Sequence, residues 1–267
     1  MTQREIERRL ARARLSYGHG TWNAREEAAW LLSSVKSEKK LRELLERRIR
    51  ERVPLAYLLK EARLGEHAFY VDERTLVPRS FIAELLRDRL APWLPKAPRT
   101  ALDLCTGSGC LAVLLALEFP GSAVDAADIS PEALQVARIN VRRYKVGKRV
   151  RAFRSNLLQK TRKYDLIVTN PPYVTTTSMK KLPLEYRREP ALGLAAGPDG
   201  LDVVRRILAD ARQHLNPGGL LVCEIGGNRR ALERAYPGVE FAWPEVSDPG
   251  TVFILQREQL PGAASRG

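Results

Sequence analysis

The stretch that decides the fold is Ala101-Leu102-Asp103-Leu104-Cys105-Thr106-Gly107-Ser108-Gly109-Cys110. It reads as a short buried strand that runs into a glycine turn, and a helix is expected to start at Cys110. Glycine at positions 107 and 109 lets the backbone approach a ligand closely, and the amino terminus of the following helix attracts a carboxylate or another negative group. Because ligands of open parallel sheets bind at the carboxyl ends of the strands, we expect a ligand at this turn.

The chain on both sides of this turn alternates between predicted strands and helices. Apolar runs predict strands at residues 100–104, 123–129, 150–153, 164–169 and 220–225. Helices are predicted between them, at residues 110–119, 131–144 and 201–214. This alternation predicts an α/β fold with a Rossmann-like, mostly parallel sheet and helices on both of its faces. At the carboxyl end we expect two further strands, at 239–243 and 252–256, to add an antiparallel pair at the sheet edge.

The residues before this sheet divide into helices and a linker. Residues 1–62 have apolar positions such as Ile6 and Leu10 near the helical period, and we expect them to form a helical domain that recognises the substrate. Residues 63–98 are expected to contain a helix at 81–90, a proline-rich linker and a hairpin formed by Phe69, Val71 and Leu76. The catalytic domain is then expected to span residues 99–267.

The net charge predicts a polyanionic partner. The 267 residues carry a formal net charge of +14, and a field of that sign speeds the encounter with nucleic acid. Residues 138–163 contain no Asp or Glu, and their cations form either a solvated face or a patch that faces nucleic acid. Only Tyr144 and Phe153 interrupt this tract with aromatic rings, which argues against a platform for stacking single-stranded bases.

The composition predicts a cytoplasmic protein with no metal site and no membrane span. Its cysteines, Cys105, Cys110 and Cys223, lie in apolar stretches and form no Cys-x-x-Cys pair, which suits a reducing compartment. Its histidines are too far apart in the sequence to match the spacing of a zinc site. The amino terminus lacks the apolar core of a secretory signal, and no stretch has the ~20 apolar residues that span a bilayer.

Asp128, at the end of the second predicted strand, is a candidate ligand for a ribose. A carboxylate at this place can accept hydrogen bonds from both hydroxyls of an adenosine ribose. The alternative is that Asp128 caps the helix that begins with Ser130 and Pro131. A nicotinamide dinucleotide fits less well, because Ala112 stands where the third glycine of its phosphate-binding turn would be. The pattern therefore favours a cofactor with ribose and adenine but no pyrophosphate.

The segment Asn170-Pro171-Pro172-Tyr173 indicates the reaction, since it follows an apolar strand and its polar residue is held by two prolines. Each proline biases the preceding residue toward an extended conformation, so the Asn170 side-chain oxygen and the Pro171 carbonyl point in fixed directions. These two acceptors match the two hydrogens of a planar NH2 group, and Tyr173 can pack beside the substrate plane. A planar nitrogen has a delocalised lone pair, so catalysis would come from positioning and electrostatics rather than from a strong base.

These motifs resemble the class I methyltransferases that act on amide or exocyclic amino nitrogens. Two further segments, residues 70–80 and residues 189–195, are similar to the protein-glutamine N5-methyltransferases. Within that family, Val77-Pro78-Arg79-Ser80 resembles the branch that modifies large-subunit ribosomal protein L-three. The branch that modifies release factors usually continues Pro-Arg with Pro-x-Thr-Glu.

The resemblance implies a mechanism, a cofactor and a partner. Asn170, Pro171, Pro172 and Tyr173 would hold the substrate glutamine. The implied cofactor is S-adenosylmethionine, and its expected ligands are Asp103, Cys105, Thr106, Gly107, Ser108, Gly109, Asp128, Asn156 and Asn170. Asn156 departs from the pattern, because the family usually has Asp at this position. The implied partner is a ribosomal protein of the large subunit, met in an assembly intermediate that contains rRNA.

Three other functions remain open at this stage. A release factor would present the same glutamine amide to the same acceptors. The exocyclic amine of a nucleic-acid adenine or guanine would also satisfy them, and the positive charge would favour RNA or DNA. A non-enzymatic assembly factor that has kept the fold would bind the cofactor without turnover.

Overall fold

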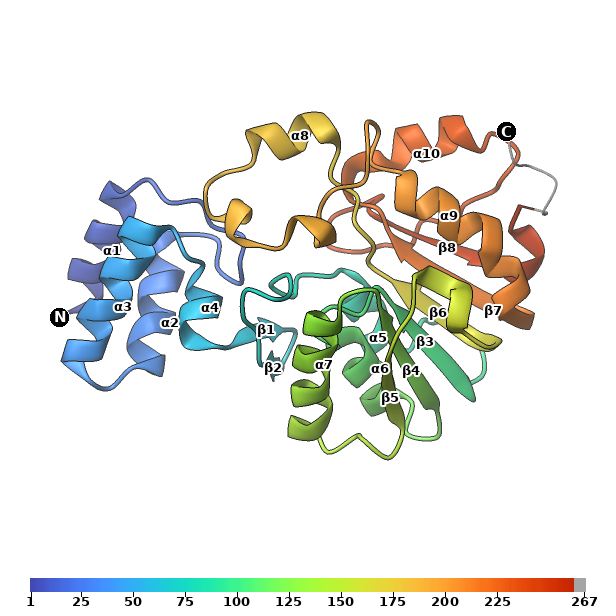
Figure 1. The fold of residues 1–267 in the computed structure, drawn as a ribbon, viewed down its shortest axis with the longest axis horizontal. Coiled ribbons are helices and arrows are strands. Elements are labelled where there is room, and N and C mark those ends of the chain that lie inside the picture. Colours follow the sequence, from blue (N-terminus) through green and yellow to red (C-terminus); the bar gives the residue numbers. More distant parts are fainter. Residues whose placement is uncertain (262–267) are drawn as a thin grey trace.

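The computed structural model describes residues 1–261, and in it a six-stranded sheet forms the centre of the larger part of the chain (Figure 1). The strands lie in the order β5-β4-β3-β6-β7-β8, and all are parallel except β8, which pairs antiparallel with β7. Their bounds are β3 Thr100–Leu104, β4 Ala123–Asp128, β5 Val150–Arg154, β6 Tyr164–Thr169, β7 Leu215–Glu224 and β8 Val252–Gln256. The predicted Rossmann-like, mostly parallel sheet with an antiparallel strand at its carboxyl-terminal edge is confirmed.

Helices cover both faces of this sheet, as Figure 1 shows. On one face α5 (Ile82–Arg87), α6 (Cys110–Glu118) and α7 (Pro131–Arg143) share an apolar core with side chains of β3, β4 and β7. On the other face α9 (Asp202–Ala211) and α10 (Arg229–Ala235) pack on the alternate side chains of the same strands. Burial on both faces explains why these strands read as continuous apolar runs rather than as alternating ones.

The strand order reverses between β3 and β6, and this fixes where a ligand can bind. The chain goes from β3 outward to β4 and β5, then returns to β6 on the other side of β3. The loops that follow β3 and β6 therefore diverge and leave a crevice at their carboxyl ends. The glycine turn follows β3 and the Asn170 segment follows β6, so the topology brings the two sequence motifs to one place.

The amino-terminal helices form a separate apolar core at one end of the molecule (Figure 1). They are α1 (Gln3–Arg12), α2 (Ala24–Ser34), α3 (Glu38–Glu51) and α4 (Leu55–Leu59). Ile6 and Leu10 of α1 are buried against α2 and α3, as the helical spacing predicts. The first helix is closed by a capping box, in which the Thr2 side chain accepts from the Glu5 backbone N–H while the Glu5 carboxylate accepts from that of Thr2.

Three expectations about local structure are wrong. Residues 239–243 form no strand, and only Ala242 pairs with Ile254 in an isolated bridge, so a single antiparallel strand lies at the sheet edge. The hairpin is formed by β1 (Ala62–Leu64) and β2 (His67–Phe69), whereas Val71 and Leu76 lie in the loop after it. Strand β7 begins at Leu215, because the Asn-Pro-Gly-Gly segment is absorbed into it through a register irregularity opposite β6.

Candidate active site

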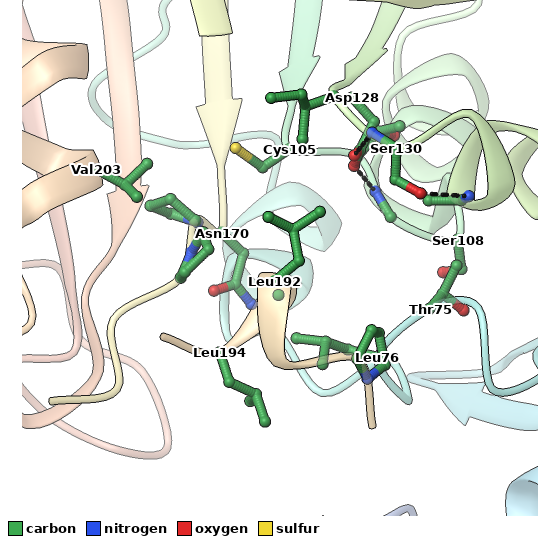
Figure 2. A pocket seen from close by; sticks show the side chains of 18 of the residues that line it. Thr75, Leu76, Cys105, Ser108, Asp128, Ser130, Asn170, Leu192, Leu194 and Val203 are labelled. Carbon is green, nitrogen blue, oxygen red and sulfur yellow. Dashed lines mark hydrogen bonds between the residues drawn. The ribbon is translucent and has the colours of Figure 1, made fainter. Parts of the chain in front are cut away.

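A cavity of about 500 Å³ opens at the carboxyl ends of β3, β4 and β6 (Figure 2). Of the residues predicted for the cofactor and the reaction, all except Gly109 line it: Asp103, Cys105, Thr106, Gly107, Ser108, Asp128, Asn156, Asn170, Pro171, Pro172 and Tyr173. Two further segments complete its wall, the loop 74–80 before α5 and residues 190–195 after the Asn170 segment. The cavity therefore combines the two sequence motifs with parts of the chain that lie far from both.

The two glycines of the turn have different roles. Gly109 has a φ of +76°, and a Cβ built there would lie 2.9 Å from the Cβ of Ala137, so this glycine lets α7 pack closely rather than lining the cavity. Gly107 has a φ of +53° and faces open space, where a Cβ would meet no described protein atom within 4 Å. The close approach of a ligand that the sequence predicted for both is thus available at Gly107 alone.

Asp103 places an unpartnered carboxylate oxygen in the cavity wall. Its Oδ2 accepts from the Thr106 hydroxyl and, at 2.9 Å, from the Ala112 backbone N–H. Its Oδ1 is buried and has no hydrogen-bond partner among residues 1–261. Burial, opposed by these hydrogen bonds and reinforced by the charge of Asp128, raises the pKa of the Asp103 carboxyl to about 7. A buried oxygen of this kind suits a cationic or N–H group of a ligand.

Asp128 holds the glycine turn as well as facing the cavity. Its Oδ2 accepts from the Gly107 backbone N–H and its Oδ1 from that of Ser130, each at 2.9 Å (Figure 2). Ser130 is itself the cap of α7, so the helix-start interpretation and the ligand interpretation describe compatible contacts. Each carboxylate oxygen keeps a further lone pair, which leaves capacity for two hydroxyl donors.

Asn156 lines the same cavity and is oriented by Arg206 of α9. Its Oδ1 accepts from the Arg206 guanidinium at 2.9 Å. The amide group therefore keeps its nitrogen as the available donor. An aspartate here would form a charged pair with Arg206 instead, so the departure from the family pattern exchanges an acceptor for a donor.

The Asn170 segment leaves two acceptors free at the end of β6. Within residues 1–261 neither the Asn170 side chain nor the Pro171 carbonyl takes part in a hydrogen bond, and both residues line the cavity. The backbone beyond them is held firmly: the Tyr173 carbonyl accepts from the Asn228 side chain at 2.7 Å, and the Val174 N–H donates to the Leu194 carbonyl at 2.7 Å. A rigid segment that presents unused acceptors is what recognition of an NH2 group requires.

Tyr173 is fixed by contacts that the sequence did not reveal. A Cβ at Gly226 would lie 2.7 Å from Cε2 of its ring, so the ring packs directly on that glycine. Its hydroxyl lies 3.5 Å from Oε1 of Glu224, whose other oxygen accepts from the Ser80 hydroxyl at 2.6 Å and the Phe81 N–H at 2.9 Å. Burial raises the pKa of the Glu224 carboxyl to about 7. Glu224 thereby joins the end of β7, the loop before α5 and the Asn170 segment.

Leucine side chains enclose the approach to Asn170, as Figure 2 shows. Leu76 comes from the loop before α5, and Leu192 and Leu194 come from the segment after Tyr173. The two walls touch, because a Cβ at Gly193 would lie 3.0 Å from Cγ of Leu76. Leu192 keeps 60% of its surface exposed, so the apolar rim continues onto the outside of the molecule.

A buried ion pair locks these two walls together. The Arg79 guanidinium makes two hydrogen bonds of 2.7 Å to the Glu189 carboxylate, which also accepts from the Val77 N–H at 2.9 Å. His19, from the amino-terminal helical region, lies 3.6 Å from the same carboxylate. Burial would raise the pKa of Glu189, but the nearby His19 ring and the hydrogen bonds from Arg79 outweigh it and hold the pKa at about 2.

Four residues of the site had no predicted role: Thr75, Arg79, Glu189 and Glu224. Thr75 is 2% exposed, and its hydroxyl has no partner among residues 1–261 although the residue lines the cavity. Its backbone carbonyl accepts from the Tyr57 hydroxyl of α4, so the amino-terminal helices help to position it. No local spacing could reveal these residues, because each acts across the fold rather than within a motif.

Several cations of the tract 138–163 stabilise the fold. Asp125 of β4 pairs with Arg151 of the neighbouring strand β5 at 3.0 Å and with Arg162 of the loop before β6 at 3.2 Å. Arg149 donates to the carbonyl of Ala116 at the end of α6. This part of the tract therefore joins elements of the catalytic core, whereas its sequence alone left a solvated face and a nucleic-acid patch as the two options.

The described part of the chain shows neither a metal centre nor a membrane helix. Among residues 1–261, no three His, Cys, Asp or Glu side chains are grouped so that they could hold a metal ion. No helix in that range is both long enough and apolar enough to cross a bilayer.

Solved methyltransferase structures share the fold. The hMettl16 catalytic domain in complex with MAT2A 3'UTR hairpin 6 superposes with a TM-score of 0.55 at 16% identity, covering 85% of this chain and 90% of that one. A methyltransferase from Pyrococcus furiosus gives 0.51 at 19% identity, covering 83% and 99%. At these identities the likeness concerns the architecture alone.

Sequence relatives are much closer. The family model of the methyltransferase small domain matches residues 84–183. A ribosomal protein uL3 glutamine methyltransferase of Neisseria meningitidis is 47% identical over 276 residues, which covers 95% of this chain and 91% of that protein. One of Burkholderia pseudomallei is 43% identical over 286 residues, covering 96% and 93%. The chain is therefore a methyltransferase and belongs to the family of ribosomal protein uL3 glutamine methyltransferases.

Proposed function

We propose that the protein transfers the methyl group of S-adenosylmethionine to the side-chain amide nitrogen of a glutamine in ribosomal protein uL3, in the cytoplasm. The observation that carries this proposal is the pair of unused acceptors, Asn170 Oδ1 and Pro171 O, at the rim of a cavity whose other end has buried, unpartnered polar atoms. The names of the relatives from Neisseria meningitidis and Burkholderia pseudomallei support uL3 as the acceptor protein.

The residues of the cavity fit the cofactor. Asp103 offers a free carboxylate oxygen for its ammonium group, Thr75 a free hydroxyl, and Gly107 open space beside the turn. Asp128 keeps two lone pairs for the ribose hydroxyls, and Asn156 keeps a donor. Cys105, Thr106 and Ser108 complete this wall. When bound, the cofactor supplies a methyl group that is electrophilic because it is attached to a sulfonium sulfur.

The chain contributes orientation and exclusion of water. Asn170 Oδ1 and Pro171 O each accept one amide hydrogen, which fixes the plane of the NH2 group and directs its lone pair. The side chains of Tyr173, Leu76 and Leu192 cover the amide and remove its water, so that the acceptors act in a medium of low dielectric. With the cofactor bound, the amide nitrogen would take the methyl group as its bond to sulfur breaks, and one of the two amide hydrogens held by Asn170 Oδ1 and Pro171 O would leave as a proton.

The partner is proposed in more detail. We propose that uL3 is met in an assembly intermediate that contains rRNA, because the enzyme has a net charge of +14 and ribosomal proteins are themselves basic. Residues 1–62 are proposed to select the acceptor, since the helical region contacts the walls of the cavity through His19 and Tyr57.

Peptide mass spectrometry tests the function directly. The protein and S-adenosylmethionine are incubated in parallel with unmethylated uL3, with release factors and with rRNA, and every product is fragmented to locate the methyl group. The expected result is one methyl group on a glutamine of uL3 alone. Methylation of release factors only would refute the partner, and methylation of RNA only would refute the amide substrate.

A further inference from the structure

A band of exposed cations lies beside the mouth of the cavity, and we propose that it binds RNA phosphates next to the acceptor glutamine. This basic band consists of Lys180, Lys181, Arg187 and Arg188, with Arg12 and Arg14 across the boundary to the amino-terminal helices. The inference rests on the proposed function, since it concerns how that acceptor is presented. It assigns RNA binding to a surface outside the tract 138–163.

The basic band adjoins the cavity through residues that line it. Leu182 and Tyr186 form part of the cavity wall, and they lie between the lysines and the arginines in the sequence. The Arg187 guanidinium donates to the carbonyls of Leu182, at 2.9 Å, and Lys180, at 3.3 Å. Its charge is therefore held over the same turn that contributes a side chain to the cavity.

Hydrogen bonds also connect the band across the two parts of the molecule. Figure 1 shows the segment after α8 (Thr176–Lys181) lying between the amino-terminal helices and the sheet. The Arg188 guanidinium donates to the Glu51 carbonyl at the end of α3. Next to it, Arg52 donates to the Arg14 carbonyl at 3.2 Å. The acceptors of these bonds are neutral carbonyl groups, so the positive charges of the band remain uncompensated.

Acidic groups near the band do not cancel it. Residues 174–188 contain one carboxylate, Glu185, whose side chain is 2% exposed and lies 3.0 Å from Arg52 and 3.5 Å from Arg48. Within residues 1–261, none of the six cations of the band forms a salt bridge, and exposed Glu51 is paired with Arg47. The outward surface of the segment thus presents a single sign of charge.

RNA phosphates are the partner that fits such a surface. A row of cations without exposed aromatic rings matches a charged backbone and offers no platform on which bases stack. The proposed acceptor is a ribosomal protein, and a basic protein alone would be repelled by the band. RNA bound to that protein reverses the sign of the interaction at the place where the glutamine must enter.

The test compares two charge-matched variants of the full-length enzyme. Lys180→Gln/Lys181→Gln removes two charges from the band, whereas Lys145→Gln/Lys148→Gln removes two exposed charges from the turn between α7 and the edge strand β5. Binding to a labelled large-subunit rRNA fragment is measured by fluorescence anisotropy between about 50 and 200 mM KCl. Methyl transfer is measured with uL3 bound to that fragment and with an excised glutamine peptide of uL3.

Each outcome decides the proposal. The band variant is expected to lower the slope of log Kd against log salt by about 1.4–1.8, and to lower kcat/KM for the uL3–RNA complex about tenfold. Its transfer to the peptide and all readouts of the control variant should match those of the wild type. Equal losses in both variants, no loss in either, or equally strong competition by polyglutamate would overturn RNA recognition by the band. Failure of the wild type to methylate either the peptide or the uL3–RNA complex would instead refute the proposed function.

Discussion

At the residue scale, burial determines the protonation state of Asp103. Its oxygen Oδ2 accepts hydrogen bonds from Thr106 and Ala112, while Oδ1 is buried without a partner within the described residues. Burial raises its pKa to about 7, far above the ordinary value for aspartate of about 3.9. A cation that binds beside Oδ1 stabilises the charged form, so ligand binding and proton release are coupled there.

This coupling predicts the pH dependence of cofactor binding. Below about pH 7 Asp103 is protonated in the free protein, so the affinity for S-adenosylmethionine should fall by up to tenfold for each pH unit down to about pH 5. Isothermal titration calorimetry measures the affinity. In Asp103→Asn the side-chain oxygen can still accept from Thr106 and Ala112, and the profile should be flat. An unchanged slope in this variant would show that another group titrates.

At the scale of elements, the sequence was a good guide to the buried core and a poor one to its surroundings. Strand β3, strand β6 and helix α7 appear within one residue of their predicted bounds, because apolar runs, a glycine turn and a proline at the helix start are local signals. Residues 239–243 are equally apolar but form no strand, since an edge position depends on which neighbour is available to pair.

The candidate site divides in the same way. Its two motifs were visible because strand topology brings consecutive signals to one edge of the sheet. The roles of Glu189 and Glu224 could not be predicted, because their partners Val77 and Ser80 are more than a hundred residues away in the sequence. The role of Thr75 could not be predicted either, because it rests on a hydroxyl without a hydrogen-bond partner among the described residues, which no sequence pattern shows. Gly109 was assigned to the ligand although helix packing requires it, since a glycine that contacts a helix and one that contacts a cofactor look the same in a sequence.

The link between Glu189 and Arg79 predicts a large loss of stability on substitution. Glu189→Gln leaves Arg79 without its carboxylate, and breaking a buried pair costs about 3–5 kcal/mol in the free energy of unfolding. The pKa of about 2 lies below the ordinary value, so the stabilisation is present above about pH 4.3 and is lost as pH falls toward 2.

Urea unfolding at several pH values measures this difference. The gap between wild type and Glu189→Gln should be constant from about pH 5 to 8 and should shrink below about pH 4. Glu233→Gln, which removes an exposed pair with Arg229, serves as the control and should leave stability unchanged. A gap of the same size at pH 3 would contradict the ion-pair account.

At the scale of the whole molecule, apolar and charged contacts both join the helical region to the sheet. The helical region has its own buried cluster, the sheet has one on each face, and a small fourth cluster, which includes Tyr57 and Val77, lies between the two regions. Between them Glu185 accepts from the Ser16 N–H at 3.1 Å and pairs with Arg48 and Arg52. Since the segment with Glu185 also forms the wall of the cavity, the helices and the site are mechanically connected.

Removal of that charge should uncouple the helical region from the sheet. Glu185→Gln leaves Arg52 facing a neutral group and leaves Arg48 with Glu27 as its carboxylate partner, so the helical region should melt separately and at a lower temperature than the sheet. Differential scanning calorimetry should show two transitions in the variant and one in the wild type. A single transition at a lower temperature would mean that apolar contacts, not Glu185, couple the two regions.

The most direct test of the central claim, that the cavity binds the cofactor at one end and the Asn170 segment orients the amide at the other, is a pair of measurements on Asn170→Ala. Single-turnover methyl transfer to uL3 should fall by about 10²–10³-fold, the usual cost of removing one acceptor or donor that orients a reacting group. The calorimetric affinity for S-adenosylmethionine should stay that of the wild type. Transfer that persists, or a loss of cofactor affinity as large as the loss of rate, would contradict the account.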